Sequence, residues 1–313
     1  MTAANRTSPT LTVVVPVYNE GDALRGFLPE LTEACANNGW ELIVVDDGST
    51  DDTWSVLSGL AGRPYARVAR HKVNRGYGGA LKTGLLMTSS SHVVTVDGDG
   101  QHSVSDIGRV FEFAVEQEAD LVIGDRGRSL YSGRIRFIGK ALIRAFTRLL
   151  MRLPIHDLNS GFKLYRTDLV QRYLPLCPDS MAFSDVIALA FMSQKRLVKE
   201  VPITVHKRTT GSSSIGISTA VETAIEILNM VVLFNPLRVF LPLAVACVGA
   251  GVLWGLRFVL MGRGVSTASL LAIILGALAF MIGLIASQLS AIRMAMLEVP
   301  RVEGPRQGEI EDA

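Results

Sequence analysis

Short apolar runs alternate with amphipathic stretches over the N-terminal part of the chain. Between the runs, apolar residues recur at helical spacing, as they do from Leu24 to Ala34. Strands that alternate with helices predict parallel βαβ units, with helices on both faces of one sheet. The runs are rich in β-branched residues and predict buried strands at 11–15, 41–45, 93–96 and 120–124, with a weaker one at 65–69.

The pattern changes after Arg238, where two uncharged apolar stretches follow each other. Residues 239–256 and 265–292 are each long enough to cross a bilayer. They predict a transmembrane helical hairpin rather than two buried helices of a soluble core. Residues 219–234 are amphipathic and predict a helix along the membrane surface. The glycines expected to let the two spans pack closely are Gly249, Gly251, Gly255, Gly276 and Gly283.

Composition agrees with a membrane-anchored protein of a reducing compartment. Hydrophobic residues make up 49% of the chain, which is high for a soluble enzyme, and the net charge of +2 is too small to suggest nucleic-acid binding. Three cysteines without metal-type spacing do not suggest a disulfide framework. The basic residues that flank the two spans weakly favour a cytoplasmic location for both ends of the hairpin.

Acidic residues follow three of the predicted strands. Glu20 follows the first strand, Asp46 and Asp47 end the second, and Asp97 and Asp99 follow the 93–96 strand. Because parallel strands end at one edge of a sheet, these carboxylates are expected to share a crevice, where they repel one another unless a cation or hydrogen-bond donors are present. Such oxygens suit Mg²⁺ or Mn²⁺. The alternatives are solvated Asp/Gly turns or helix caps.

A glycine-rich loop at 74–80 precedes another predicted helix. It lacks the G-x-G-x-x-G spacing after a first strand, so a dinucleotide fingerprint is rejected. Its small residues are expected to let the backbone lie close to a base or ribose. A flexible loop without that role remains the alternative.

Basic residues without an acidic neighbour fill the segment 126–152. Lys140, Arg144, Arg148 and Arg152 recur at every fourth position, which predicts a basic stripe on a helix that binds an anionic membrane surface. An ordinary surface helix with solvated arginines is the alternative. The guanidinium groups expected to grip a phosphate near the crevice are those of Arg126, Arg134 and Arg136.

Two later loops add candidate groups. Asp157 precedes a predicted strand and either faces an acceptor or forms an Asx turn. A further strand is predicted at 198–205. After it, His206, Lys207 and Arg208 stand beside a Gly/Ser loop that contains Ser212, which predicts either a flap over a diphosphate or a polar linker.

Four segments, VVVPVYNE, VVDDGSTDDT, NRGYGGA and VDGDGQH, together resemble the family 2 glycosyltransferases with a GT-A fold. More narrowly, the chain is similar to the polyprenyl-phosphate glycosyltransferases, the group of dolichol-phosphate mannose synthase. The resemblance implies a Rossmann-like, mostly parallel α/β sheet. The chain departs from the family pattern after Gly211, where Ser214 and Ile215 stand in place of the lysine that the family usually carries. The resulting domains are a flexible tail (1–9), a GT-A domain (10–215), a juxtamembrane helix (216–236), two spans (237–292) and a cytoplasmic tail (293–313).

The resemblance also implies roles for individual residues. The metal, Mg²⁺ or Mn²⁺, would be surrounded by Asp97, Asp99 and Gln101. The nucleotide sugar would be held by Pro16, Tyr18, Glu20, Asp46, Asp47, Gly76, Asp97 and Gly98. Asp157 joins Asp97 and Asp99 as a catalytic candidate, either as a base or as a group that orients the acceptor. The acceptor phosphate and the diphosphate would meet Arg126, Arg134, Arg136, Lys140, His206, Lys207, Arg208 and Ser212.

The expected reaction is transfer of a sugar, with inversion, from a nucleotide diphosphate sugar to a polyprenyl phosphate at the cytoplasmic membrane face. The sugar and the choice between UDP and GDP stay open, and a homo-oligomer is possible. A processive polysaccharide synthase is a rival, although the chain has no Gln-x-x-Arg-Trp motif and only two predicted spans. The rival from another class is a non-catalytic membrane scaffold that binds a nucleotide sugar.

Overall fold

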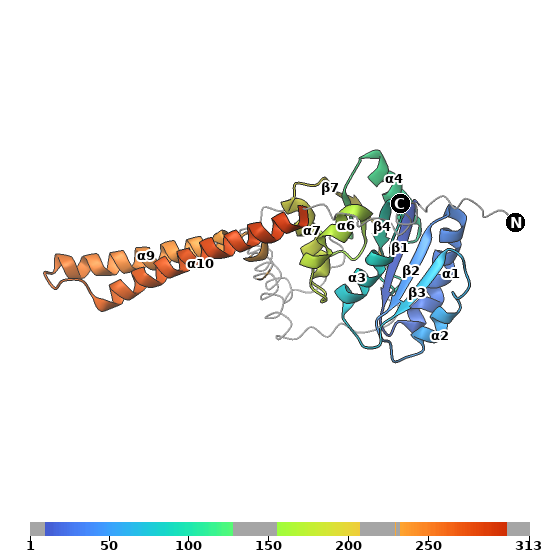
Figure 1. Ribbon diagram of the computed structural model, residues 1–313, viewed down its shortest axis with the longest axis horizontal. Coiled ribbons are helices and arrows are strands. Elements are labelled where there is room, and N and C mark those ends of the chain that lie inside the picture. The colour runs from blue at the N-terminus through green and yellow to red at the C-terminus, as the bar shows by residue number, and fades with distance from the viewer. Residues whose placement is uncertain (1–9, 128–154, 207–228, 230–231, 299–313) are drawn as a thin grey trace, which may run out of the picture. The chain divides into compact units, whose positions relative to one another are not determined.

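The computed structural model describes residues 10–127, 155–206, 229 and 232–298. The chain divides into two compact units, Met1–Glu226 and Ile227–Ala313. The first contains a sheet with helices, and the second contains two long helices (Figure 1). The predicted basic stripe and most of the predicted surface helix lie outside the described residues. Among the candidate site residues, the same is true of Arg134, Arg136, Lys140, Lys207, Arg208 and Ser212.

A seven-stranded mixed sheet forms the centre of the first unit, with the strand order β3-β2-β1-β4-β6-β5-β7. Strand β6 runs antiparallel to both of its neighbours, and the other pairings are parallel. The predicted mostly parallel sheet is therefore confirmed. The strands are β1 (Leu11–Val17), β2 (Glu41–Asp46), β3 (Ala66–Arg70), β4 (His92–Thr95), β5 (Leu121–Asp125), β6 (Lys163–Arg166) and β7 (Val198–Pro202).

Helices cover both faces of this sheet. Val13 and Val15 of β1 belong to the apolar cluster that also contains side chains of α1, α2 and α4. Val14 faces the other way, toward Gly84 of α3. Because both faces are covered, β1 is buried at all seven positions and needs no polar alternation. The helices are α1 (Gly21–Asn38), α2 (Thr53–Ser58), α3 (Tyr77–Met87), α4 (Ser105–Glu116), α6 (Thr167–Tyr173) and α7 (Phe183–Ser193), with a 3₁₀ turn, η2, at Leu174–Leu176.

Strand β7 is shorter than the sequence predicts. It ends at Pro202, whereas the apolar alternation continues to Val205. Beyond Pro202 the backbone N–H of Thr204 donates to Oδ2 of Asp106 at 2.6 Å, which draws the chain toward α4. Val205 then forms an isolated antiparallel bridge with His102, so this segment joins the sheet edge that carries the predicted metal motif.

The second unit contains α9 (Leu237–Leu260) and α10 (Thr267–Glu298). Both helices are long and apolar enough to cross a membrane. Helix α9 extends beyond the predicted stretch at both ends, whereas α10 begins two residues later than predicted and ends six residues later. Close helix contact is confirmed at Gly251, Gly255, Gly276 and Gly283, where an added Cβ would meet atoms of the facing helix at 2.6–2.9 Å. At Gly249 the prediction is wrong, because nothing lies within 4 Å of that position.

Replacement of Gly276 by alanine is expected to destabilise the hairpin. The new Cβ would lie 2.8 Å from the Ala244 carbonyl oxygen and 2.6 Å from Cγ2 of Val248, so the helices must separate, at a cost of about 1–3 kcal/mol. Gly249→Ala is the matched control, since its Cβ enters open space. Thermal unfolding in detergent should show a lower transition for Gly276→Ala only. Equal transitions for both variants would contradict the packing.

Candidate functional site

The carboxyl ends of β1, β2 and β4 lie next to one another, as the sequence predicts. Val17 pairs with Asp46, and the Asp47 backbone N–H donates to the Val17 carbonyl at 2.9 Å. Strand β4 lies on the other side of β1, with the Val96 N–H donating to Val14 at 3.0 Å. The residues that follow these strands therefore share one edge of the sheet. Its exposed part includes Tyr18, whose accessible fraction is 44%.

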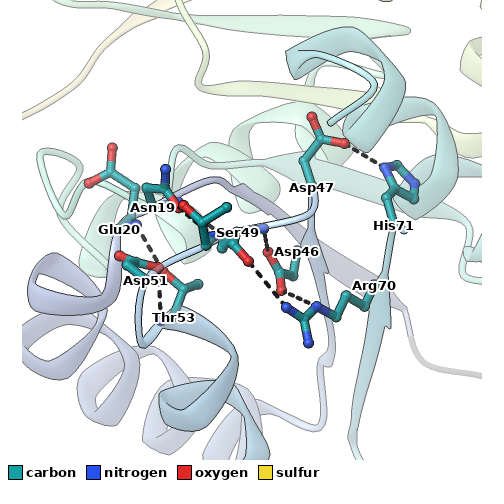
Figure 2. A network of polar contacts seen from close by, with 10 residues as sticks. Asn19, Glu20, Asp46, Asp47, Ser49, Asp51, Thr53, Arg70 and His71 are labelled. Carbon is teal, nitrogen blue, oxygen red and sulfur yellow. Dashed lines mark hydrogen bonds and ion pairs between the residues drawn. The ribbon is translucent and has the colours of Figure 1, made fainter. Parts of the chain in front are cut away.

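Polar contacts fix the loop between β1 and α1 against the loop after β2 (Figure 2). The Asn19 N–H donates to Oγ of Ser49 at 2.9 Å, and the Thr50 N–H donates back to Oδ1 of Asn19 at 2.8 Å. Asn19 adopts a left-handed φ of 54°, which asparagine tolerates. The Glu20 N–H donates to Oγ1 of Thr53 at 3.0 Å. These reciprocal bonds hold Glu20 at the sheet edge.

The two aspartates that end β2 have different partners. Asp46 is fully buried; its Oδ1 accepts from the Ser49 N–H at 2.9 Å, and its Oδ2 lies 3.1 Å from Nε of Arg70 (Figure 2). Asp47 points toward the glycine-rich loop. Its Oδ1 accepts from the Arg75 N–H at 2.9 Å and lies 2.6 Å from Nδ1 of His71.

The carboxylate of Asp47 therefore organises the glycine-rich loop. Its Oδ2 accepts from the Gly76 N–H at 2.8 Å. His71 bridges from Asp47 to Thr83 of α3, with Nε2 lying 2.9 Å from the Thr83 hydroxyl. The sequence interpretation missed His71, and only its position directly after β3 could have indicated it.

The glycines of this loop are required by packing within the protein. Gly76 has a φ of +90°, and a Cβ there would lie 2.5 Å from the Asp179 carbonyl oxygen. A Cβ on Gly78 would lie 2.4 Å from the Pro178 carbonyl. The Gly78 N–H donates to the Asp179 carbonyl at 2.9 Å, and Nζ of Lys82 donates to the Asp179 carboxylate at 2.7 Å. The structure thus gives these glycines a role beyond the predicted approach to a base or ribose.

Asp97 is held at the end of β4 by neighbours from three parts of the chain. The Tyr77 hydroxyl donates to its Oδ1 at 2.8 Å, and Nε2 of His102 lies 3.6 Å from Oδ2. Burial acts to raise the pKa of Asp97, but His102, Tyr77 and the charge of Arg126 together hold it below its ordinary value. Burial and the adjacent carboxylate raise the pKa of Tyr77 well above its usual range, so this hydroxyl stays a donor.

The loop after Asp97 continues the predicted metal motif. Oδ1 of Asp99 accepts from the Gln101 N–H at 3.1 Å, and the Gln101 carbonyl accepts from the His206 N–H at 2.8 Å. The structure therefore joins His206 to this motif. Gly98 lies over β1, and a Cβ there would meet Cγ1 of Val17 at 2.6 Å.

The donor set fits a hard divalent ion that also takes ligands from a substrate. Asp97 keeps 30% of its side chain exposed, and Asp99 follows two residues later. In the part of the chain that the structure describes, no three His, Cys, Asp or Glu side chains form a metal-holding group by themselves. Mg²⁺ commonly binds through one or two carboxylates, with substrate phosphates and water completing its shell. Asp97 and Asp99, with Gln101 nearby, suit that arrangement.

Asp157 and Arg126 bind each other. Oδ2 of Asp157 accepts from Nε of Arg126 at 2.7 Å, and Oδ1 accepts from an Arg126 terminal nitrogen at 2.8 Å. Burial acts to raise the pKa of Asp157, and the Arg126 guanidinium lowers it below the ordinary value. The Asp157 carbonyl also accepts from the Ser160 N–H at 3.3 Å, which forms a backbone turn. This is not the Asx turn expected as an alternative, because that turn needs a side-chain oxygen of Asp157, and the side-chain oxygens bind Arg126. Asp157 lies beyond the segment 126–152, which contains no acidic residue, so the run of basic residues did not indicate this ion pair.

Glu200 on β7 supports the same turn. Its Oε1 accepts from the backbone N–H groups of His156 and Asp157 at 2.7 and 3.0 Å. Gly161, at the other end of the turn, lies directly against Asp97, since a Cβ there would meet the carboxylate oxygens at 2.2–2.5 Å. The Asp157 turn and the metal motif are therefore parts of one site. Sequence reasoning did not assign Tyr77, His102, Lys163 or Glu200, although the first three lie within segments that it singled out.

Comparison with known proteins bears on this arrangement. The chain is 30% identical over 216 residues to the undecaprenyl-phosphate 4-deoxy-4-formamido-L-arabinose transferase of Edwardsiella ictaluri, which covers 68% of this chain and 65% of that protein. This chain therefore spans slightly less than two thirds of that relative. It is also 30% identical over 214 residues to the polyprenol monophosphomannose synthase of Mycolicibacterium smegmatis, covering 64% of this chain and 79% of that protein.

A solved structure shares the fold. The glucosyl-3-phosphoglycerate synthase of Mycobacterium tuberculosis, in complex with Mn²⁺, UDP and phosphoglyceric acid, superposes with a TM-score of 0.55 at 20% identity, over 71% of this chain and 78% of that chain. Among family models, that of the GtrB C-terminal hairpin matches residues 235–292, and that of glycosyl transferase family 2 matches residues 12–174, just over half of the chain. The resemblance expected from the four sequence motifs is confirmed, and the chain belongs to glycosyl transferase family 2.

Proposed function

We propose that this protein transfers a sugar from a nucleotide diphosphate sugar, a UDP- or GDP-hexose, to a polyprenyl phosphate at the cytoplasmic face of a membrane. The observation that carries the proposal is the contact between Gly161 and Asp97, which joins the Asp157 turn to the acidic sheet edge. This contact supports the proposal because it brings the turn proposed to face the acceptor next to the sheet edge proposed to hold the donor. The names of the two curated relatives, a polyprenyl-phosphate transferase and a polyprenol monophosphomannose synthase, support the same acceptor class.

The nucleotide sugar would lie along the ends of β1 and β2. Tyr18 is exposed there and offers a ring face, while Asp46 and Asp47 stiffen the surrounding loops. Mg²⁺ or Mn²⁺, held by Asp97 and Asp99 with Gln101, would supply Lewis-acid stabilisation of the departing diphosphate. The remaining members of the proposed nucleotide-sugar site are Pro16, Glu20, Gly76 and Gly98.

The acceptor would approach from the side of Asp157. A lipid phosphate is already ionised near neutral pH, so no enzyme base is needed to activate it. The lowered pKa of Asp157 suits a group that orients Arg126 better than one that removes a proton. Arg126 would then meet the phosphate. Arg134, Arg136, Lys140, His206, Lys207, Arg208 and Ser212 complete the proposed phosphate-binding set.

A single displacement of this kind would invert the anomeric centre and require no covalent intermediate. Rate acceleration would come from positioning and from charge stabilisation. The α9–α10 hairpin would keep the domain at the membrane, where the acceptor lipid resides. That arrangement would place the end of α10 on the same side as the catalytic domain, because the described residues contain two candidate spans.

The test is a donor panel with the full-length protein. UDP- and GDP-sugars are each incubated with polyprenyl phosphate and Mg²⁺ or Mn²⁺, and the lipid fraction is analysed by mass spectrometry. We expect one donor to give a lipid of the mass of a polyprenyl-phosphate sugar, and EDTA to remove that product. Sugar found only in polymeric product would support the processive synthase instead, and no turnover of any donor would support the scaffold.

Alanine at Gly78 is expected to weaken nucleotide binding by about tenfold. Its Cβ would lie 2.4 Å from the Pro178 carbonyl, so the glycine-rich loop must move away from the segment that supports it, and a displacement near 1 Å has large effects on a site. Gly26→Ala is the matched control, because nothing lies within 4 Å of that position. Calorimetry with UDP and GDP measures both variants. Unchanged nucleotide affinity in Gly78→Ala would show that the glycine-rich loop is not part of the nucleotide site.

A further inference from the structure

Lys163 is a buried charge that the reaction described above does not use. It is the first residue of β6, in the middle of the sheet, and has no accessible surface. Its neighbours in sequence, Phe162 and Leu164, are buried in the apolar core. A fully buried lysine is uncommon and is unfavourable unless other groups compensate its charge. An apolar residue of similar length would fill the same space more favourably if packing alone decided.

The ammonium group of Lys163 is bound to the turn that follows Asp157. Nζ donates a hydrogen bond to the Ser160 carbonyl. The hydroxyl of Thr95, on β4, donates to the next carbonyl of this turn, that of Gly161, at 2.8 Å. These two bonds hold the Ser160–Gly161 peptide carbonyls at the point where Gly161 lies against the Asp97 carboxylate. A shift of this turn would therefore change the surroundings of Asp97 directly.

Lys163 also belongs to the charge balance of the site. Burial lowers its pKa to about 8, while the carboxylates of Asp185, Asp157 and Asp97 act in the opposite direction. Arg126 is the other cation that acts on it. Asp185 lies in the first turn of α7, next to Ser184, which hydrogen-bonds the Tyr77 hydroxyl that binds Asp97. Acidic groups thus surround this lysine from several elements.

We propose that Lys163 is a positioning residue for sugar transfer, an inference that rests on the proposed function. Its ammonium holds the Ser160–Gly161 turn against Asp97 and supplies positive charge close to Asp97 and Asp157. Without Lys163, less positive charge would lie near the carboxylates of Asp97 and Asp157. The turn would also lose the hydrogen bond that its Ser160 carbonyl accepts from the core. Lys163 does not touch the substrates; it acts through Asp97 and the Asp157 turn.

Three substitutions separate charge from hydrogen bonding. Lys163→Met removes both, Lys163→Gln keeps a hydrogen-bond donor without charge, and Lys163→Arg keeps both. The control is Lys195→Met, the same change at an exposed lysine. We expect kcat of Lys163→Met to fall about 10- to 100-fold, which is the usual effect of replacing a residue that orients metal-binding side chains without touching the metal. The KM for the donor should change less than about threefold. Lys163→Arg should turn over faster than Lys163→Gln, and Lys195→Met should match the wild type.

The affinity for Mn²⁺ distinguishes an effect of the Lys163 charge from a merely structural role of this side chain. Free Mn²⁺ is measured by electron paramagnetic resonance with full-length protein and saturating UDP or GDP, whichever the wild type binds more tightly. Lys163→Gln removes the positive charge near Asp97 but keeps a hydrogen-bond donor for the turn, so it should tighten Mn²⁺ binding, whereas a loosened site would weaken it. Tighter binding with reduced kcat supports the proposal. Unchanged or weaker binding, or a kcat within about threefold of wild type, overturns it.

Two further outcomes are also decisive. If Lys163→Met does not fold, the comparison of Lys163→Arg with Lys163→Gln replaces it, and equal kcat values overturn the proposal. If the wild type forms no lipid-linked sugar, the proposed function fails, but the Mn²⁺ comparison between the wild type and the Lys163 variants still tests the effect of the charge on Asp97.

Discussion

Asp97→Asn is expected to reduce formation of lipid-linked sugar by about 10³-fold, since it removes the charge of a carboxylate proposed to hold the metal beside the leaving diphosphate. The substitution preserves volume, so the packing of Gly161 against this side chain is retained. It changes an acceptor of the Tyr77 hydrogen bond from a carboxylate to an amide. The product is measured by mass spectrometry of the lipid fraction, and Mn²⁺ binding is measured in parallel.

Asp22→Asn is the matched control for this variant. Asp22 lies on the exposed side of α1, where its side chain is 80% accessible and pairs with Arg25. We expect wild-type turnover and wild-type Mn²⁺ affinity from it. If Asp97→Asn formed product at the rate of Asp22→Asn, the assignment of the metal to the end of β4 would be wrong.

The same carboxylates give a prediction about acid stability. The pKa values of Asp97 and Asp157 are lowered in the folded protein. Their charged contacts therefore stabilise the fold above the ordinary carboxyl pKa of about 4, and this contribution is lost as the pH falls through the lower folded-state values. Thermal unfolding of Asp157→Asn should depend less on pH than that of the wild type in this range. An identical pH dependence would show that the ion pair adds nothing to stability.

Asp157→Asn is expected to lower kcat by about 10²-fold. It should lower the free energy of unfolding at neutral pH by only about 1–3 kcal/mol. The amide cannot accept both bonds from Arg126, whose guanidinium then loses the orientation that two carboxylate contacts give it. The measurement is kcat with saturating donor over a series of polyprenyl phosphate concentrations. Asp168→Asn is the control, because that residue pairs with Arg166 at an exposed position.

A double-mutant cycle decides what Asp157 does. If Asp157 acts by orienting Arg126, then Arg126→Gln and Asp157→Asn should each lower kcat, and the double variant should be no slower than the slower single one. If Asp157 were the general base, its replacement would abolish turnover even where Arg126→Gln retained it. The second pattern would contradict the proposed orienting role.

The acidic ends of β1, β2 and β4 show how far local pattern reaches. Apolar runs followed by Glu20, Asp46 and Asp97 were sufficient to predict a parallel sheet whose carboxylates share one edge, because side-chain hydrophobicity decides which segments are buried and parallel pairing aligns their ends. The uncharged stretches in the C-terminal unit likewise predicted two long apolar helices. Gly249 marks the limit of that reasoning, since composition does not say which side of a helix meets its partner.

The sequence by itself therefore determined the family, the positions of the main strands along the chain and the residue types at the sheet edge. Only the tertiary structure decided which groups bind one another: Arg126 with Asp157, Asp47 with the glycine-rich loop, and Lys163 with the turn beside Asp97. Hydrophobic periodicity is a local property of the chain, and the sequence carries it directly. Ion pairs and hydrogen bonds depend on distances of a few ångströms between residues far apart in sequence, and these distances exist only after the sheet has formed.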